Sequence, residues 1–290
     1  MKTRANIGLI VGLALLSLAG GAPRATAAIL FGSSAPAVGV DLYTIDSGTA
    51  AATPVGTDNR FDTYIADIEY GGGVIYAAEG RVLRTISPST GQVSGISSSL
   101  TLRFPAGGGD SDVLTALEFV GATLYAGFTE EDAREDTYLT TVDLATGDVS
   151  IIGATGIGSP LGGLAFDPAS GVMFSITAGG SVAQLHTIDL VSGAATLVGP
   201  VTVDGAGLGA TALEFGPDGV LYALPNRRDP LAGHLLRLDP ATGEATDLGD
   251  TGIADLNALT SIPEPAVLPL LAIALGAAGL LRKRNRRGGQ

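Results

Sequence analysis

Apolar and polar residues alternate in short runs through the middle of the chain, and one pattern returns about every 48 residues. An apolar, aromatic and small residue stand in succession around Tyr76, Tyr125, Phe174 and Tyr222, at intervals of 49, 49 and 48 residues. Before each of these steps stand two apolar residues spaced by two, and a turn separates the two runs. Alternation with period two, bounded by such turns, predicts β-hairpins.

Two further short strands follow each predicted hairpin. A polar turn ends in a glycine at Gly91, Gly147, Gly193 and Gly243, and a short apolar run comes after it. Each unit therefore contains four strands, which we call a, b, c and d, in about 47 residues. This length and strand count are typical of one β-propeller blade.

The fifth unit is divided between the two ends of the repeat region. Residues 257–260 have the pattern of a strand a, whereas residues 30–32, 42–48 and 52–56 have the patterns of strands b, c and d. The 235 residues from 28 to 262 correspond to five units of 47. The sequence therefore predicts an all-β fold, a five-bladed β-propeller closed by N- and C-terminal strands, since closure removes free sheet edges. A β-sandwich is the alternative, but it does not require a recurring aromatic column.

The first 27 residues differ from the repeats. Lys2 and Arg4 precede an apolar run, and Ala25-Thr26-Ala27 ends the segment with small residues. This order is typical of a secretory signal peptide that is cleaved before Ala28. A retained N-terminal membrane helix is the alternative. We expect the repeat region to be exported.

The C-terminal segment predicts a single transmembrane helix. Residues 266–281 contain no charged side chain, and a basic cluster follows them at Arg282, Lys283, Arg284, Arg286 and Arg287. Sixteen residues of helix reach about 24 Å, which can span a membrane core of about 30 Å with local thinning. Positive residues remain cytoplasmic, so the cluster serves as a cytoplasmic anchor and the repeats lie on the opposite side.

The tripeptide Pro263-Glu264-Pro265 stands directly before this span. Over residues 263–287, the order of Pro-Glu-Pro, apolar span and Arg-rich tail resembles the PEP-CTERM sorting signal of exported bacterial proteins. The resemblance implies that an exosortase in the membrane recognises the tripeptide. It also implies that the chain is anchored transiently and then reaches the cell surface or the extracellular space, in bacteria that make exopolysaccharide. The D-P-A-T-G turn at residues 239–243 and the blade length resemble generic β-propeller repeats of the WD40 and NHL kind.

Charge and composition exclude several functions. Residues 28–262 contain eight arginines, no lysine and 28 acidic residues, a net charge of −20. Such a surface repels phosphates and excludes a nucleic-acid partner. With no cysteine and only two histidines in the chain, a thiolate metal site and a cysteine nucleophile are excluded as well.

Two groups of acidic residues are candidate cation sites. Glu69, Glu118 and Glu214 occupy one position in strand a of three units, where the innermost strands of a propeller line its channel, and converging carboxylates suit Ca²⁺. Asp110 and Asp112, with the acidic run 130–136, fall in connections that emerge on one face. Weak Ca²⁺ binding is the only candidate cofactor interaction. Solvated or hydrogen-bonded carboxylates are the alternative interpretation of both groups.

A third set of acidic residues is better explained by local structure. Asp46, Asp143, Asp189 and Asp239 open the turn between strands c and d. At this position an aspartate accepts hydrogen bonds from nearby backbone N–H groups. We therefore expect turn capping here rather than a calcium site.

No motif of a known catalytic mechanism occurs, so we expect a binding protein rather than an enzyme. The sequence favours an exported cell-surface or extracellular-matrix propeller, with exopolysaccharide or another surface protein as its partner. Two alternatives stay open. One is a propeller hydrolase, lactonase or lyase with a metal at the central channel, and the other is a purely structural matrix component.

Overall fold

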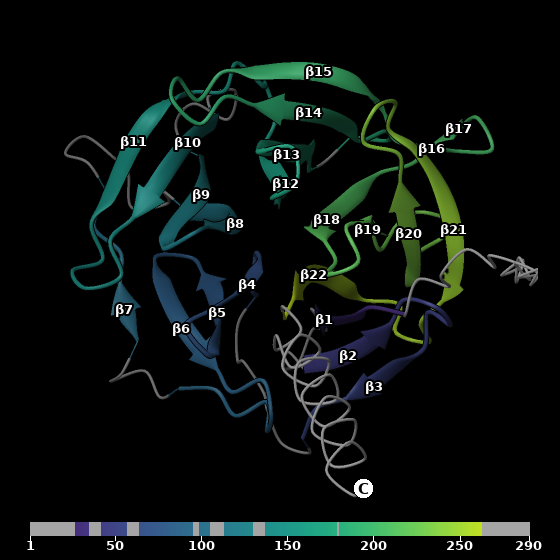
Figure 1. Ribbon diagram of the computed structural model, residues 1–290, viewed down its shortest axis with the longest axis horizontal. Helices are drawn as coiled ribbons and strands as arrows, with labels where there is room; N and C mark the ends of the chain where they lie inside the picture. Colours follow the sequence, from purple (N-terminus) through teal and green to yellow (C-terminus); the bar gives the residue numbers. More distant parts are fainter. Residues whose placement is uncertain are drawn as a thin grey trace, which may run out of the picture.

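The computed structural model describes residues 27–34, 42–56, 64–94, 99–104, 113–129, 137–178 and 180–262. These residues form 22 β-strands in five sheets, and none of them lies in a helix. The sheets surround a common axis as the blades of a propeller (Figure 1). The described part of the chain is therefore all-β, and its fold is a five-bladed β-propeller.

The expected end segments cannot be compared with this structure. Within the described ranges no helix has both the length and the apolar composition needed to cross a membrane. The sorting motif, the span and the basic cluster at 263–287 lie outside the described residues. So does the expected signal peptide, apart from its last residue.

Three blades are continuous in the sequence and contain four strands each, in the spatial order of the chain. Blade 1 consists of β4 (Ile68–Gly71), β5 (Val74–Glu79), β6 (Val82–Ile86) and β7 (Leu100–Thr101). Blade 2 consists of β8 (Val113–Val120), β9 (Thr123–Thr129), β10 (Thr137–Val142) and β11 (Val149–Ala154). Blade 3 consists of β12 (Leu161–Asp167), β13 (Val172–Thr177), β14 (Gln184–Ile188) and β15 (Ala195–Pro200).

The other two blades are built differently. Blade 4 consists of β18 (Ala210–Phe215), β19 (Leu221–Pro225), β20 (His234–Leu238) and β21 (Glu244–Asp250), with the hairpin β16 (Thr202–Val203) and β17 (Ala206–Gly207) at its outer edge. Blade 5 consists of β22 (Leu256–Ser261), β1 (Ile29–Ser34), β2 (Leu42–Asp46) and β3 (Ala52–Pro54).

The closure of the ring by both ends of the repeat region is confirmed. Strand β22 pairs antiparallel with β1, from Ser261 opposite Leu30 to Leu256 opposite Ser34. The C-terminal strand is thus the innermost strand of a sheet whose other three strands come from the N-terminal part. A closed ring gives each blade two neighbours, so no blade face is left exposed at a seam.

The aromatic column packs between the blades. Five hydrophobic clusters fill the interfaces, and each joins residues of one blade to residues of the next. One aromatic of strand b belongs to each cluster, namely Phe31, Tyr76, Tyr125, Phe174 and Tyr222. The regular spacing of these aromatics therefore reflects packing, because each interface between blades contains a large apolar side chain at the equivalent position of strand b.

The turn between strands c and d differs from the expectation in blade 5. Gly91, Gly147, Gly193 and Gly243 have φ angles of 66° to 82°, which favour glycine. In blade 5 the position four residues after Asp46 is occupied by Ala50, with φ of 59°, and not by a glycine. Ala50 is completely buried at the interface with blade 4, so packing of its methyl group offsets the backbone strain.

Two connections between blades contain more β-structure than the sequence indicated. In blade 1 the outer strand does not follow Gly91 directly, as the repeat pattern predicts, but is β7 at Leu100 and Thr101. The connection between β15 and β18 contains the β16–β17 hairpin, which lies outside the four strands predicted for each unit, and β16 pairs in parallel with β21. Both segments add hydrogen bonds at the rim, where a sheet edge would otherwise be free.

Candidate cation site in the central channel

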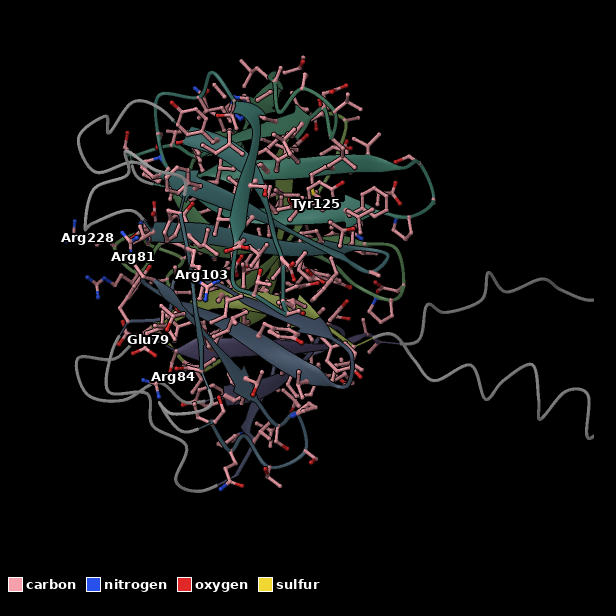
Figure 2. The ribbon with its side chains drawn as sticks, turned by 90° about the vertical axis from the view of Figure 1, so that its left-hand side faces the viewer. Glu79, Arg81, Arg84, Arg103, Tyr125 and Arg228 are labelled. Carbon is pink, nitrogen blue, oxygen red and sulfur yellow. The ribbon has the colours of Figure 1, made fainter. Side chains whose placement is uncertain are left out.

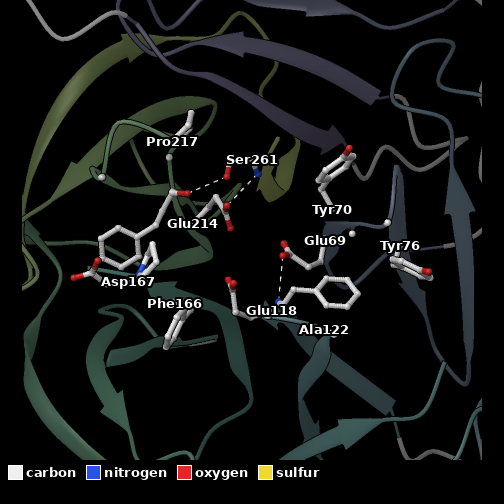
Figure 3. A pocket seen from close by; sticks show the side chains of 18 of the residues that line it. Glu69, Tyr70, Tyr76, Glu118, Ala122, Phe166, Asp167, Glu214, Pro217 and Ser261 are labelled. Atoms are coloured by element: carbon white, nitrogen blue, oxygen red, sulfur yellow. Dashed lines mark hydrogen bonds between the residues drawn. The ribbon is translucent and has the colours of Figure 1, made fainter. Parts of the chain in front are cut away.

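Three glutamates from three blades converge in the channel. Glu69 lies on β4, Glu118 on β8 and Glu214 on β18, the innermost strands of blades 1, 2 and 4. Each offers a carboxylate oxygen within 4.8 Å of the other two. All three side chains are buried, with 5 to 7 % exposure. Figure 3 shows their carboxylates directed at a common centre.

The strand register explains why these residues meet. Each glutamate lies opposite the aromatic residue of strand b in its own a–b hairpin. The pairs are Glu69 with Tyr76, Glu118 with Tyr125 and Glu214 with Tyr222. The equivalent position in blade 3 is Ala165, which lies opposite Phe174. Because side chains alternate between the two faces of a strand, equal register in every blade places these residues at one height in the channel.

Two of the glutamates also join neighbouring inner strands. Glu69 Oε1 accepts the N–H of Phe119 in blade 2 at 3.2 Å, and its Oε2 accepts the hydroxyl of Thr260 in blade 5 at 2.9 Å. Glu214 Oε1 accepts the N–H of Ser261 in blade 5 at 3.0 Å. Inner strands of different blades do not pair as a sheet, so side-chain acceptors satisfy their inward backbone groups.

Glu118 is the least satisfied member. Its hydrogen bonding within the described residues is limited to the backbone N–H of Phe166 in blade 3. No side chain of the described residues donates a hydrogen bond to Glu118, although only 7 % of this residue is exposed. A buried carboxylate has capacity for several donors or a cation, so Glu118 retains free acceptor capacity toward the centre of the channel.

Burial dominates the electrostatics of the group. Desolvation raises the pKa of Glu69 from 4.5 to about 8, against the hydrogen bonds from Thr260 and Phe119 that lower it. Desolvation likewise raises the pKa of Glu118 and of Glu214 well above the usual range, and the charge of Glu69 raises both further. Without a cation, the folded protein therefore favours protonated carboxyls at this position.

A fourth carboxyl, Asp67, lies beneath the group and was missed in the sequence. It is 2 % exposed, and its two oxygens accept the N–H groups of Ile68 and Leu117, each at 2.9 Å. Burial raises its pKa well above the ordinary value. The available signal was its position two residues before Glu69, because alternate residues of a strand share a face.

A pocket of about 980 Å³ opens over the three glutamates. The turns between strands a and b form its rim, and several aromatic side chains stand among its walls (Figure 3). These aromatics are Tyr70, Tyr76, Phe119, Phe166 and Phe215. None of the described residues that line it is lysine, arginine or histidine, so the pocket contains carboxylates without a basic side chain to neutralise them.

The other acidic candidates have different outcomes. Asp110, Asp112 and the run 130–136 lie outside the described residues. The turn aspartates cap their own turns as expected. Asp189 Oδ1, for example, accepts the N–H groups of Val191 and Ser192 at 3.0 and 2.7 Å, and these bonds lower the pKa of its carboxyl.

The two histidines lie on strands c of blades 3 and 4. His186 on β14 is mostly buried, which lowers its pKa. His234 on β20 has its Nδ1 3.0 Å from Asp247 on β21, a pairing that the sequence spacing did not reveal. Among the described residues no serine or threonine hydroxyl bonds to either ring, so the His–Asp pair has no hydroxyl nucleophile beside it.

Comparisons with known proteins give low similarity. No family model and no curated protein matches the chain. A crystal structure of a nidogen/laminin complex is 15 % identical over 82 % of this chain and 87 % of that chain, with a TM-score of 0.46. A putative 6-phosphogluconolactonase from Bacteroides uniformis is 15 % identical over 77 % and 82 %, with a TM-score of 0.42. The Dos1 propeller is 11 % identical over 78 % and 69 %, with a TM-score of 0.40. Similarity at this level carries no function to this chain.

Proposed function

We propose that this chain is an exported cell-surface or extracellular-matrix propeller that binds its partner with the help of a Ca²⁺ ion held by Glu69, Glu118 and Glu214. The observation that carries the proposal is the convergence of three buried carboxylates within 4.8 Å in the central channel. Buried charges are found paired or bound to a metal, and no basic side chain among the described residues lines this pocket.

The donor set favours a hard divalent cation. Ca²⁺ takes six to eight oxygen ligands at 2.3–2.6 Å in a flexible geometry, so oxygens up to 4.8 Å apart fit around one ion. Mg²⁺ requires distances of 2.0–2.1 Å and a contraction of the group. Three carboxylates leave coordination positions toward the 980 Å³ pocket, where oxygens of a partner or of water complete the shell.

We expect Ca²⁺ to raise the melting temperature of the purified protein at pH 8. With 1 mM Ca²⁺ and a Kd of about 0.1 mM, within the range of extracellular calcium modules, the stabilisation is about 1.4 kcal/mol. For a domain of this size that corresponds to a shift of about 4 °C. Glu118→Gln should abolish the shift, because it removes the carboxylate with the most acceptor capacity.

The control is Asp189→Asn, the same chemical change in an exposed turn where asparagine also caps. It should retain the full shift. Melting is compared in CaCl₂, MgCl₂ and NaCl at matched ionic strength. Equal melting temperatures in all three salts, or an undiminished shift in the Glu118→Gln variant, would contradict the calcium site.

Export and sorting belong to the same proposal, and the sequence alone supports them. We infer that residues 1–27 direct export and that an exosortase recognises Pro263-Glu264-Pro265. The chain is then anchored through residues 266–281 until its tail is processed. The fold adds one geometric argument. Strand β22 ends at Ser261, which lines the glutamate pocket, so the sorting motif follows directly from that face.

The short distance to the span orients the propeller in this proposal. Three residues separate Ile262 from residue 266, so these two positions are at most about 14 Å apart. While the span anchors the chain, the glutamate pocket therefore faces the membrane and the opposite end of the channel faces the surroundings. Processing of the tail would open the glutamate pocket to exopolysaccharide or to another surface protein.

Replacing Pro263-Glu264-Pro265 by three alanines should leave the propeller folded but retain the chain in the inner membrane. The last strand of the propeller ends at Ser261, before the motif begins, so we expect the substitution to affect recognition rather than folding. Cell fractionation and the mass of the C-terminal peptide are the measurements. Alanines at residues 288–290 are the matched control, with normal delivery. Normal processing of the Pro-Glu-Pro variant would refute exosortase recognition.

A further inference from the structure

A second pocket, of about 310 Å³, lies at the opposite end of the channel. Strand β22 connects the two ends, because Leu256 and Asn257 line the second pocket whereas Ser261 lines the first. Polar side chains dominate the second pocket. Its described lining consists of Tyr64, Thr211, Asn226, Arg227, Arg228, Asp255, Leu256 and Asn257.

Arg227 and Arg228 supply uncommitted positive charge. Both are exposed in the connection between β19 and β20, and neither forms an ion pair with a described residue. Other arginines are occupied, since Arg84 pairs with Glu79 and Arg103 with Asp148. Figure 2 shows Arg228 at the left-hand face of the propeller, and Arg81 and Arg103 lie toward the same face. Two arginines that line one pocket and form no ion pair with a described residue suit a carboxylate ligand.

The backbone that carries these arginines is held in place. Asn226 donates its N–H to the carbonyl of Gly209 at 2.9 Å, and its side-chain oxygen accepts the N–H of Arg228 at 3.1 Å. Asp229 donates its N–H to the carbonyl of Asn226 at 2.9 Å and continues the turn. The turn therefore presents the two arginines on an ordered support, which lowers the entropic cost of binding.

An exposed aromatic ring stands beside the arginines. Tyr64 is 64 % exposed, the most exposed of the described aromatic residues with a large apolar surface. Aromatic residues make up only 5 % of the chain, and the others named above pack between blades. An exposed tyrosine at a pocket provides a flat apolar face and a polar edge, which suits the C–H face of a sugar ring.

The lining also contains two polar groups without partners. Thr211 Oγ1 and Asn257 Oδ1 are buried and form no hydrogen bond within the described part of the chain. Asn257 is only 8 % exposed, and its amide group donates to the carbonyl of Ile65 at 2.8 Å. A buried polar atom left without a partner destabilises the folded state, so these two oxygens add hydrogen-bonding capacity to the lining of this pocket.

We propose that the second pocket binds an anionic carbohydrate, specifically a uronate residue of an oligosaccharide. Arg227 and Arg228 receive the carboxylate, Tyr64 packs on the sugar ring, and Asn226 and Asp255 bind hydroxyl groups. The carboxylate of Asp255 accepts hydroxyl protons and disfavours a densely charged anion such as phosphate. The assignment rests on the proposed surface-binding function and adds a second binding site to it, at the end of the channel away from the glutamates. This second site does not depend on the calcium site.

The test uses titration calorimetry of the purified full chain in detergent, with trigalacturonate as the anionic probe and maltotriose as the neutral one. EDTA is present throughout, so the calcium site contributes nothing. We expect a Kd near 10⁻⁴ M for trigalacturonate, weakened by salt, and no measurable heat for maltotriose. The double variant Arg227→Ala/Arg228→Ala should weaken binding at least tenfold, and Tyr64→Ala should weaken it about tenfold.

Arg237→Ala is the matched control. Arg237 is exposed on β20, donates a hydrogen bond to Thr246 and does not line the pocket. Its removal therefore takes away a positive charge outside the pocket and should leave the Kd unaltered. Melting curves verify that all variants fold. Absence of trigalacturonate binding, equal binding of maltotriose, or equal losses in Arg237→Ala and the double variant would each overturn the proposal. If Ca²⁺ raises the melting temperature but trigalacturonate does not bind, the uronate proposal fails and the calcium proposal stands. If trigalacturonate binds but Ca²⁺ leaves the melting temperature unchanged, the calcium proposal fails and the uronate proposal stands.

Discussion

Raising the pH from about 5 to about 8 in the presence of EDTA should lower the free energy of unfolding of the propeller by on the order of 4 kcal/mol. Burial raises the pKa of Glu69 in the folded protein from 4.5 to about 8. Between these values the folded state binds more protons than the unfolded state, so stability decreases as pH rises. The stabilisation from protonated Glu69 is complete below pH 4.5 and is lost as the pH rises through about 8. Glu118, Glu214 and Asp67 act in the same direction.

Urea denaturation at each pH measures this loss. Glu69→Gln should reduce the slope by the equivalent of one proton, whereas Asp189→Asn should leave it unchanged in this range. Ca²⁺ should restore stability at pH 8 but not at pH 5, because the ion competes with the protons for the same oxygens. Stability that is constant or increasing from pH 5 to pH 8 in EDTA would show that the channel carboxyls are not held protonated.

Gly163→Ala should destabilise the propeller by about 3 kcal/mol. A Cβ atom at this residue would lie 2.5 Å from the backbone nitrogen of Leu213 and 3.1 Å from the carbonyl carbon of Ala212. These atoms belong to β18, the inner strand of blade 4, and backbone cannot move aside without separating the two blades. The φ angle of Gly163 is not in the left-handed region, so the effect measures close approach rather than backbone strain.

The control for this substitution is Gly158→Ala. A Cβ at Gly158 meets no atom within 4 Å, and its φ angle is also not positive. Its free energy of unfolding should stay within about 0.5 kcal/mol of the parent protein. Chemical denaturation of both variants is the measurement. A Gly163→Ala protein as stable as Gly158→Ala would mean that blades 3 and 4 are not in such close contact.

The two ends of the channel have opposite chemistry in this propeller. Carboxylates without basic neighbours lie under the pocket from which the C-terminal strand leaves, whereas a pair of arginines borders the pocket at the other end. The net charge of −20 over residues 28–262 would not reveal this separation. It follows from the ring. The turns between strands a and b of every blade lie on one face, and the connections between strands b and c lie on the other.

The repeat itself was determined by the sequence, because local chemistry repeats with it. Each blade needs an aromatic residue at one interface height and a turn that accepts a left-handed residue, and both requirements recur with a period close to 48 residues. The divided fifth blade could be predicted from the same pattern, since β22 and β1 complete a unit only when joined. The position of Glu69, Glu118 and Glu214 in strand a was visible for the same reason.

Other features depend on contacts between residues far apart in the sequence, and only the tertiary structure decided them. Ala50 takes the place of a turn glycine because its methyl group fills a blade interface, which local turn rules do not contain. Asp67 joins the channel carboxyls through a bond to Leu117, 50 residues away. The acidity of these groups was equally hidden, because a pKa depends on the burial and the neighbouring charges that the closed ring creates, not on residue type alone.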